Sequence, residues 1–181
     1  MVTKADILLR VNAITERSLT DIDDELLEVL LDISGRDSFL TSSVSGTFTT
    51  GNTIAIPTDM AILDEIVVNS TRLEKITFAE YLDQTSGYAQ KGNLIYIYPT
   101  PATGVTYTVY YGKTHSEDVD TIEFGTRFRK AIIEGVVAAI YNGLDNYDKA
   151  REHTVLYENE ILKLMGSDFE VSQPAQIRRY V

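Results

Sequence analysis

The stretch Gly92–Gly112, GNLIYIYPTPATGVTYTVYYG, decides how we interpret this chain. It has no charged residue and holds five of the eleven tyrosines. Two runs of β-branched and aromatic residues, Leu94–Tyr98 and Val105–Tyr111, are separated by two prolines and a glycine. Proline has no N–H to donate to a strand ladder and favours a turn, so the pattern predicts a β-hairpin.

The two strands of this hairpin differ in their side-chain pattern. The second strand partly alternates between apolar and threonine residues, whereas the first, Leu-Ile-Tyr-Ile-Tyr, is apolar on both faces. A strand that is apolar on both faces needs cover on both. We expect one cover from the helices of this chain and the other from a second subunit.

Helices are predicted on both sides of this β-rich region. Thr3 with Asp6 resembles a capping box, and apolar residues at helical spacing follow, so the N-terminal helices should lie within about 4–35. Residues 126–143 are apolar nearly all round, which indicates a central buried helix. Asp145 is expected to cap a last helix, and the helical region as a whole covers about 126–165. Its buried stripe is predicted to consist of Tyr147, Ala150, Thr154, Tyr157, Ile161 and Leu164.

Between the helices lies a β insertion at about 42–112, which we expect to hold three short hairpins. Besides the tyrosine hairpin, residues 44–49 should pair with 53–56, and residues 62–68 with 72–76. The spacing of Thr77 and Glu80 predicts one short helix at Phe78–Leu82. A strand at 88–90 should lead into the tyrosine hairpin through a turn at 91–93.

The predicted fold class is therefore α+β. A helical bundle is built from the N- and C-terminal helices, an antiparallel β module is inserted between them, and an extended tail follows. Residues 1–166 are expected to form a single domain and 167–181 an extended C-terminal arm. At 181 residues with 44% apolar content, the chain is long enough to bury a core.

Composition excludes several functions. Without cysteine there are no disulfides, thiolate metal sites or cysteine nucleophiles. A net charge of -11 argues against binding nucleic acid through its phosphates, which requires clustered lysine and arginine. No apolar run reaches the length of a signal peptide core or a membrane span.

Motifs for catalysis and metal binding are weak. The Thr-rich segment 46–53 has phosphate-loop spacing but carries Asn52 where the lysine is needed. The acids at 21–25 lack the glycine and the glutamate of an EF-hand loop and suit a helix N-terminus. His115 and His153 are interpreted as solvated side chains. The sequence thus predicts no catalytic residue, no cofactor and no metal.

The tyrosines have two interpretations. Cross-strand aromatic pairs stabilise a sheet, which alone would account for them. Tyrosine is also a frequent anchor at protein interfaces, and a charge-free, two-faced hairpin favours that use. We therefore predict that this hairpin takes part in a protein interface.

The order of these elements resembles the adaptor, or head-to-tail connector, proteins of tailed bacteriophages. The resemblance covers about 4–165 and is most specific in Gly92–Tyr111 followed by the apolar helix Phe128–Tyr141. Pro57-Thr58-Asp59-Met60 before a strand and the short helix Phe78–Leu82 belong to the same layout.

The resemblance implies a structural virion protein without catalytic residues, made in the host cytoplasm and placed at the head–tail junction. Its subunits would form a ring, usually dodecameric, beneath the portal protein, extend the DNA channel without sequence-specific DNA binding, and offer a platform to tail, nozzle or tail-completion proteins. By position, the β module would face neighbouring subunits or tail proteins through Tyr96, Tyr98, Tyr107 and Tyr110. The C-terminal arm would reach for the portal or a neighbouring subunit through Ile177, Arg178, Arg179 and Tyr180.

Three alternatives remain open at this point. A tail-completion or tail-terminator protein would also form rings but would bind the tail tube. An unfamiliar enzyme or ligand-binding domain would show a concave pocket with perturbed acids or a histidine. A scaffold domain whose hairpin packs only on its own helices would be a monomer at all concentrations.

Overall fold

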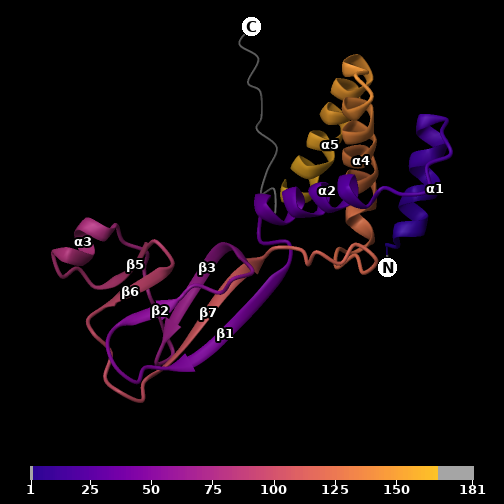
Figure 1. Ribbon diagram of the computed structural model, residues 1–181. Coiled ribbons are helices and arrows are strands. Elements are labelled where there is room, and N and C mark those ends of the chain that lie inside the picture. Colours follow the sequence, from indigo (N-terminus) through magenta and orange to yellow (C-terminus); the bar gives the residue numbers. More distant parts are fainter. Residues whose placement is uncertain (1, 167–181) are drawn as a thin grey trace, which may run out of the picture. The chain divides into compact units, whose positions relative to one another are not determined.

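The computed structural model describes residues 2–166, and their secondary structure is α+β, as predicted. Five α-helices, one short 3₁₀ helix and seven strands are present in this part of the chain (Figure 1). In chain order they are α1 (Lys4–Thr15), α2 (Asp23–Arg36), β1 (Thr41–Thr47), β2 (Thr53–Ala55), β3 (Met60–Val68), β4 (Thr71–Arg72), α3 (Phe78–Leu82), β5 (Gly87–Lys91), β6 (Leu94–Tyr98), β7 (Thr106–Lys113), η1 (Thr126–Phe128), α4 (Arg129–Gly143) and α5 (Tyr147–Gly166).

By its internal contacts the chain divides into two compact units. A helical unit comprises residues 1–33 and 116–181, of which 2–33 and 116–166 are described. A sheet unit comprises Ser34–His115. The predicted arm at 167–181 lies outside the described residues.

In the helical unit, α4 is the most buried helix, as its apolar sequence predicts. Eight of its fifteen residues are buried, and it lies along α5 and contacts α1 (Figure 1). Gly135 lies where α2, α4 and α5 meet, because a Cβ there would be 2.9 Å from Val29 and 3.2 Å from Tyr157. The absence of a side chain at this position allows the three helices to approach closely.

Helix ends are partly as predicted. The Thr3 hydroxyl accepts a hydrogen bond from the Asp6 N–H at 3.2 Å and caps α1. At α5 the cap is Asn146 and not Asp145: the Asn146 carboxamide oxygen accepts from the Lys149 N–H at 3.4 Å. Asp145 instead has a positive φ of 56°, in the turn between α4 and α5, and its carboxylate accepts from the Tyr147 hydroxyl.

The sheet unit contains two antiparallel sheets. One has the strand order β1-β7-β3-β4 and the other β2-β6-β5. Residues of both sheets form one hydrophobic core, so the two sheets pack on each other. The core residues are Phe48, Ile54, Ile66, Tyr88, Ile95, Ile97, Val109 and Tyr111.

The predicted tyrosine hairpin is wrong. Leu94–Tyr98 pairs with β2 and β5, and 106–113 pairs with β1 and β3 in the other sheet. Ile95 and Ile97 of β6 share the core with Val109 and Tyr111 of β7, so these strands face each other across the core rather than pairing at their edges. The proline-rich segment 99–105 carries the chain from one sheet to the other.

Among the other predicted features of the sheet unit, one hairpin is wrong, and a hairpin, a turn and a short helix are confirmed. The expected hairpin of 44–49 with 53–56 is also wrong, since its strands pair with β7 and β6. The hairpin of β3 with β4 is confirmed, with Asn69 and Ser70 at positive φ in the turn, but β4 has only two residues. The turn from β5 into β6 is confirmed, and so is the short helix α3, whose capping box of Thr77 and Glu80 is complete.

Candidate interaction surfaces

Tyr96 belongs to an aromatic cluster within the sheet unit. Its ring lies 5.3 Å from Phe78 and 5.5 Å from Tyr81, both on α3. The ammonium of Lys91 lies 4.1 Å from the centre of the Phe78 ring on the same cluster. The face of β6 that carries Tyr96 is thus covered in part by α3, a helix of this chain.

Tyr98 and Tyr107 are half-buried. The Tyr98 hydroxyl donates to the Gln84 side chain at 3.3 Å. Tyr107 packs on Phe48 with ring centres 5.0 Å apart. It also lies over Gly46, where a Cβ would be only 2.6 Å from the phenol oxygen. Both side chains therefore have defined contacts within their own unit.

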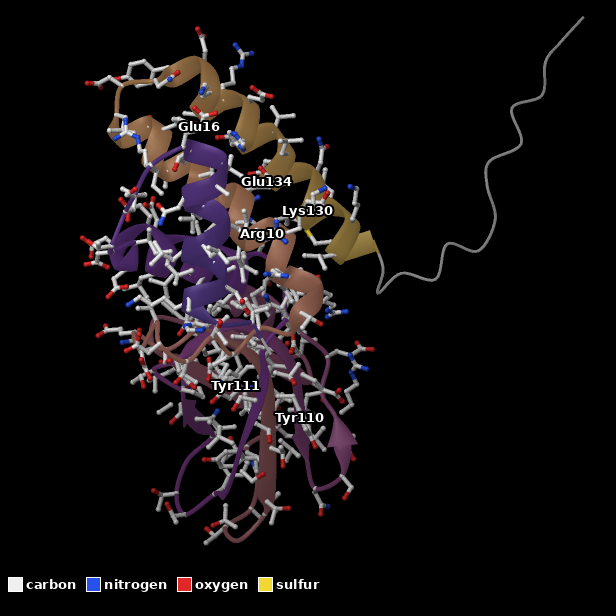
Figure 2. All side chains as sticks on the ribbon, turned by 90° about the vertical axis from the view of Figure 1, so that its right-hand side faces the viewer. Arg10, Glu16, Tyr110, Tyr111, Lys130 and Glu134 are labelled. Carbon is white, nitrogen blue, oxygen red and sulfur yellow. The ribbon has the colours of Figure 1, made fainter. Side chains whose placement is uncertain are left out.

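Tyr110 is different because 44% of it is exposed. It pairs with Ser43 on one side and Glu65 on the other, on the face of β7 opposite to the core. Its neighbour Tyr111, which Figure 2 also labels, is buried. The Tyr111 hydroxyl donates to the Asp59 carboxylate at 3.0 Å. Of the four predicted interface tyrosines, Tyr110 offers the most free surface, and the interface role of all four stays a prediction.

A second exposed apolar surface follows one side of α5. Tyr147, Val155 and Leu162 are 63%, 54% and 63% exposed. Their spacing of eight and seven residues places them within one side of a helix. We expected Tyr147 and Thr154 in the buried stripe of α5, which was wrong because both are exposed. Ala150, Tyr157 and Ile161 are buried as predicted, and Leu164 is half-buried. We call the three exposed residues Tyr147, Val155 and Leu162 the α5 stripe.

The histidines are not solvated, contrary to our expectation. His115 is 2% exposed, and its backbone N–H donates to the Ser34 hydroxyl at 3.2 Å. His153 on α5 pairs through Nδ1 with the Glu134 carboxylate on α4 at 2.7 Å, and both side chains are largely buried. The His153 ring also stacks on Tyr141. This pair links the two helices, and no sequence signal relates positions 134 and 153.

Other ion pairs lie at the surface of the helical unit. Glu160 of α5 accepts from Lys130 of α4 and from Lys163, each at 2.7 Å, and these hydrogen bonds lower the pKa of the Glu160 carboxyl. Lys4 pairs with Asp23 and Asp120, and the hydrogen bond to Asp23 raises the pKa of the Lys4 amine. Figure 2 shows Lys130 and Glu134 along α4 and Arg10 on α1.

Within residues 2–166 no group of three or more histidine, cysteine or acidic side chains could hold a metal ion. No helix in this range has the length and apolar character to cross a membrane. The predicted arm residues Ile177, Arg178, Arg179 and Tyr180 lie outside the described residues. What the described residues present is a set of exposed faces suited to contacts with other proteins.

A comparison with known protein families shows the family to which this chain belongs. The family model described as SU10 adaptor protein matches residues 2–179 of the chain. The chain therefore belongs to this family of phage head-to-tail adaptor proteins, which are virion components. A comparison with curated protein sequences gave no match.

Proposed function

We propose that this protein is the head-to-tail adaptor of its virus, assembled as a ring beneath the portal at the head–tail junction. There it extends the DNA channel and offers the platform to which tail, nozzle or tail-completion proteins attach. The observation that carries the proposal is the family match over residues 2–179, nearly the whole chain. The role is structural rather than catalytic and needs no cofactor.

Exposed apolar surface supports assembly into a ring. The α5 stripe lies in the helical unit and Tyr110 in the sheet unit, and both keep large side chains in water when the chain is alone. Apolar patches of this kind mark protein contacts. A head-to-tail contact between identical chains closes into a ring when the rotation per subunit allows it. We propose twelve copies from the family resemblance.

The charge of the chain supports passage of DNA without retention. With a net charge of -11, the chain repels phosphates. A channel wall that held DNA through lysine and arginine would slow its ejection. Weak, non-specific contact is what a conduit requires.

The arm at 167–181 is proposed to contact the portal or a neighbouring subunit through Ile177, Arg178, Arg179 and Tyr180. Two adjacent arginines in an acidic chain are suited to an acidic partner surface. Because 2–166 holds the helices and both sheets, deletion of the arm should leave the fold intact.

The test is binding to the portal protein of the same virus, measured by co-sedimentation with assembled portal. Deletion of 167–181, and the double substitution Arg178→Ala and Arg179→Ala, should weaken binding, while the melting temperature stays unchanged. Arg10→Ala, which removes an exposed arginine of α1, is the matched control and should bind as the wild type does. Portal binding that is unchanged by the deletion would exclude the role of the arm. Binding to tail tube in place of portal would favour a tail-completion protein.

A further inference from the structure

Strand β1 is an open and unprotected sheet edge. It lies at the end of the β1-β7-β3-β4 sheet and pairs with β7 only (Figure 1). Natural edge strands are usually short, charged, bulged or broken by proline, which prevents pairing with other chains. β1 has seven residues, Thr-Ser-Ser-Val-Ser-Gly-Thr, and pairs with β7 in unbroken register. It has none of these protections.

The other edges in the described part of the chain are less available. β4 at the far edge of the same sheet has two residues, one of them Arg72. In the second sheet β2 has three residues, and β5 is bridged to Lys75 and ends at Lys91. β1 is thus the longest uncharged edge among these strands.

The backbone of β1 presents its odd-numbered residues outward. The Phe48 N–H donates to the Val105 oxygen, and the Lys113 N–H donates to the Leu40 oxygen. In an antiparallel pair the direction of the hydrogen bonds alternates, so the even-numbered residues of β1 bond to β7. The N–H and C=O groups of Thr41, Ser43, Ser45 and Thr47 therefore point away from the sheet, and all four residues are exposed.

The sequence of β1 is nearly the same in both directions about Val44. Thr41 matches Thr47 and Ser43 matches Ser45, and only Ser42 and Gly46 differ. A strand that meets a second copy of itself across a two-fold axis runs antiparallel to it, so such a sequence matches itself. With the axis at Val44, the residues brought together are those whose backbone groups point outward: Thr41 with Thr47 of the partner subunit, and Ser43 with Ser45 of the partner subunit. Threonine and serine pairs across strands stabilise such a sheet.

The charge distribution favours a second copy as the occupant. Residues 38–58 and 92–112 contain no charged residue, and they pair with each other as β1 with β7 and β2 with β6. Copies of a chain with a net charge of -11 repel each other, and this repulsion is weakest where they meet through uncharged strands. Val44 adds an apolar side chain, 39% exposed, on the core side of the edge.

We propose that the free chain forms a two-fold dimer in which β1 pairs antiparallel with β1 of a second copy, making one continuous sheet. This goes beyond the proposed function. A two-fold contact is complete with two copies and does not build a ring, so it concerns the chain before assembly. In the dimer the outward backbone groups of β1 are already paired, so they cannot pair with the strands of other chains.

Cysteine cross-linking tests the axis directly, because the chain has no cysteine of its own. In the proposed dimer Val44 faces Val44 of the partner subunit as a pair without hydrogen bonds, with Cα atoms about 4.5 Å apart. That distance lies in the range of about 4.4–6.8 Å that a disulfide spans. Val44→Cys should therefore form a disulfide-linked dimer under mild oxidation, and Thr53→Cys, exposed on the edge strand β2, should not.

Ser43→Lys tests the edge without a cross-link. Lysine on an edge strand opposes pairing, so dimerisation measured by analytical ultracentrifugation should weaken by about tenfold or more. Thr71→Lys adds the same charge at the opposite edge and should dimerise as the wild type does. Melting temperatures confirm that the variants fold. A wild type that is monomeric at all concentrations, or cross-linking of Val44→Cys no faster than of Thr53→Cys, would overturn the dimer. A free chain that does not cross-link through position 44 and yet forms a ring on the portal would overturn the dimer while supporting the proposed function.

Discussion

Substitution of Gly135 by alanine is the perturbation whose effect on stability the structure defines best. Alanine in the interior of a helix is favoured over glycine by about 1 kcal/mol. At this position, however, the new Cβ would lie 2.9 and 3.0 Å from the two methyl groups of Val29 and 3.2 Å from the Tyr157 ring. The steric cost therefore opposes the helix propensity.

Neither neighbour can move easily. Valine is β-branched and stiff at χ1, and the hydroxyl of Tyr157 is hydrogen-bonded to Asp32. Overpacking of a core costs about 1–3 kcal/mol, and these rigid neighbours place Gly135→Ala near the upper end. After the gain in propensity, we expect a net loss of about 2 kcal/mol in the free energy of unfolding.

Urea unfolding followed by circular dichroism measures this loss. Gly143→Ala is the matched control, since it lies in the same helix and a Cβ there meets nothing within 4 Å. Val29→Ala should make room, so the double variant should lose less than the sum of the two single losses, by about 1–2 kcal/mol. A Gly135→Ala protein as stable as the wild type would refute the close approach of α2, α4 and α5.

Three further predictions concern polar contacts. Glu160→Gln should flatten the pH dependence of stability: the lysines lower the pKa of Glu160 below its ordinary value of 4.5, so its contribution is present above that pH and is lost as the pH falls through the folded pKa. Thermal melts of the wild type and the variant from pH 7 to pH 3 measure this pH dependence. Because water screens the lysines, the stability difference between the two proteins should not exceed about 1 kcal/mol. A variant with the same pH profile as the wild type would contradict the pairing. Glu134→Ala removes the partner of the largely buried His153 and should lower the free energy of unfolding in urea by about 1–3 kcal/mol. Glu152→Ala, at an exposed position of α5, is the control and should lower it little. Equal losses for the two variants would count against the pair. Thr77→Ala breaks the capping box of α3 and should speed amide hydrogen exchange in 78–82 but not in α4; unchanged exchange would show that the cap does not hold α3.

Local features of the fold could be predicted from the sequence, and non-local pairing could not. The bounds of α3 and the cap of α1 follow from residues three positions apart, and the prediction for both was correct. The pairing of β6 and β7 depends on strands far away in the chain, β1, β2, β3 and β5. Adjacent runs with a turn between them favour a hairpin by proximity alone, and nothing in Leu94–Tyr98 itself indicates that its partner is Thr53–Ala55.

Which residues are available at the candidate surfaces also depends on contacts that are distant in the chain, so the sequence alone did not predict it. Composition indicated tyrosine contacts, but only a structure separates Tyr96, packed on α3, from Tyr110, which is exposed. For His153 the charged neighbours along the chain suggested water, whereas the partner Glu134 comes from another helix. The order of elements carried more information than any single residue, and the family match is consistent with that order.

Electron microscopy of the purified protein mixed with the portal of the same virus, together with native mass determination, tests the adaptor function most directly. The proposed function predicts a closed ring stacked coaxially on the portal, with a mass that corresponds to the roughly twelve copies proposed from the family resemblance. A protein that stays free of the portal, or that binds tail tube instead, would contradict it.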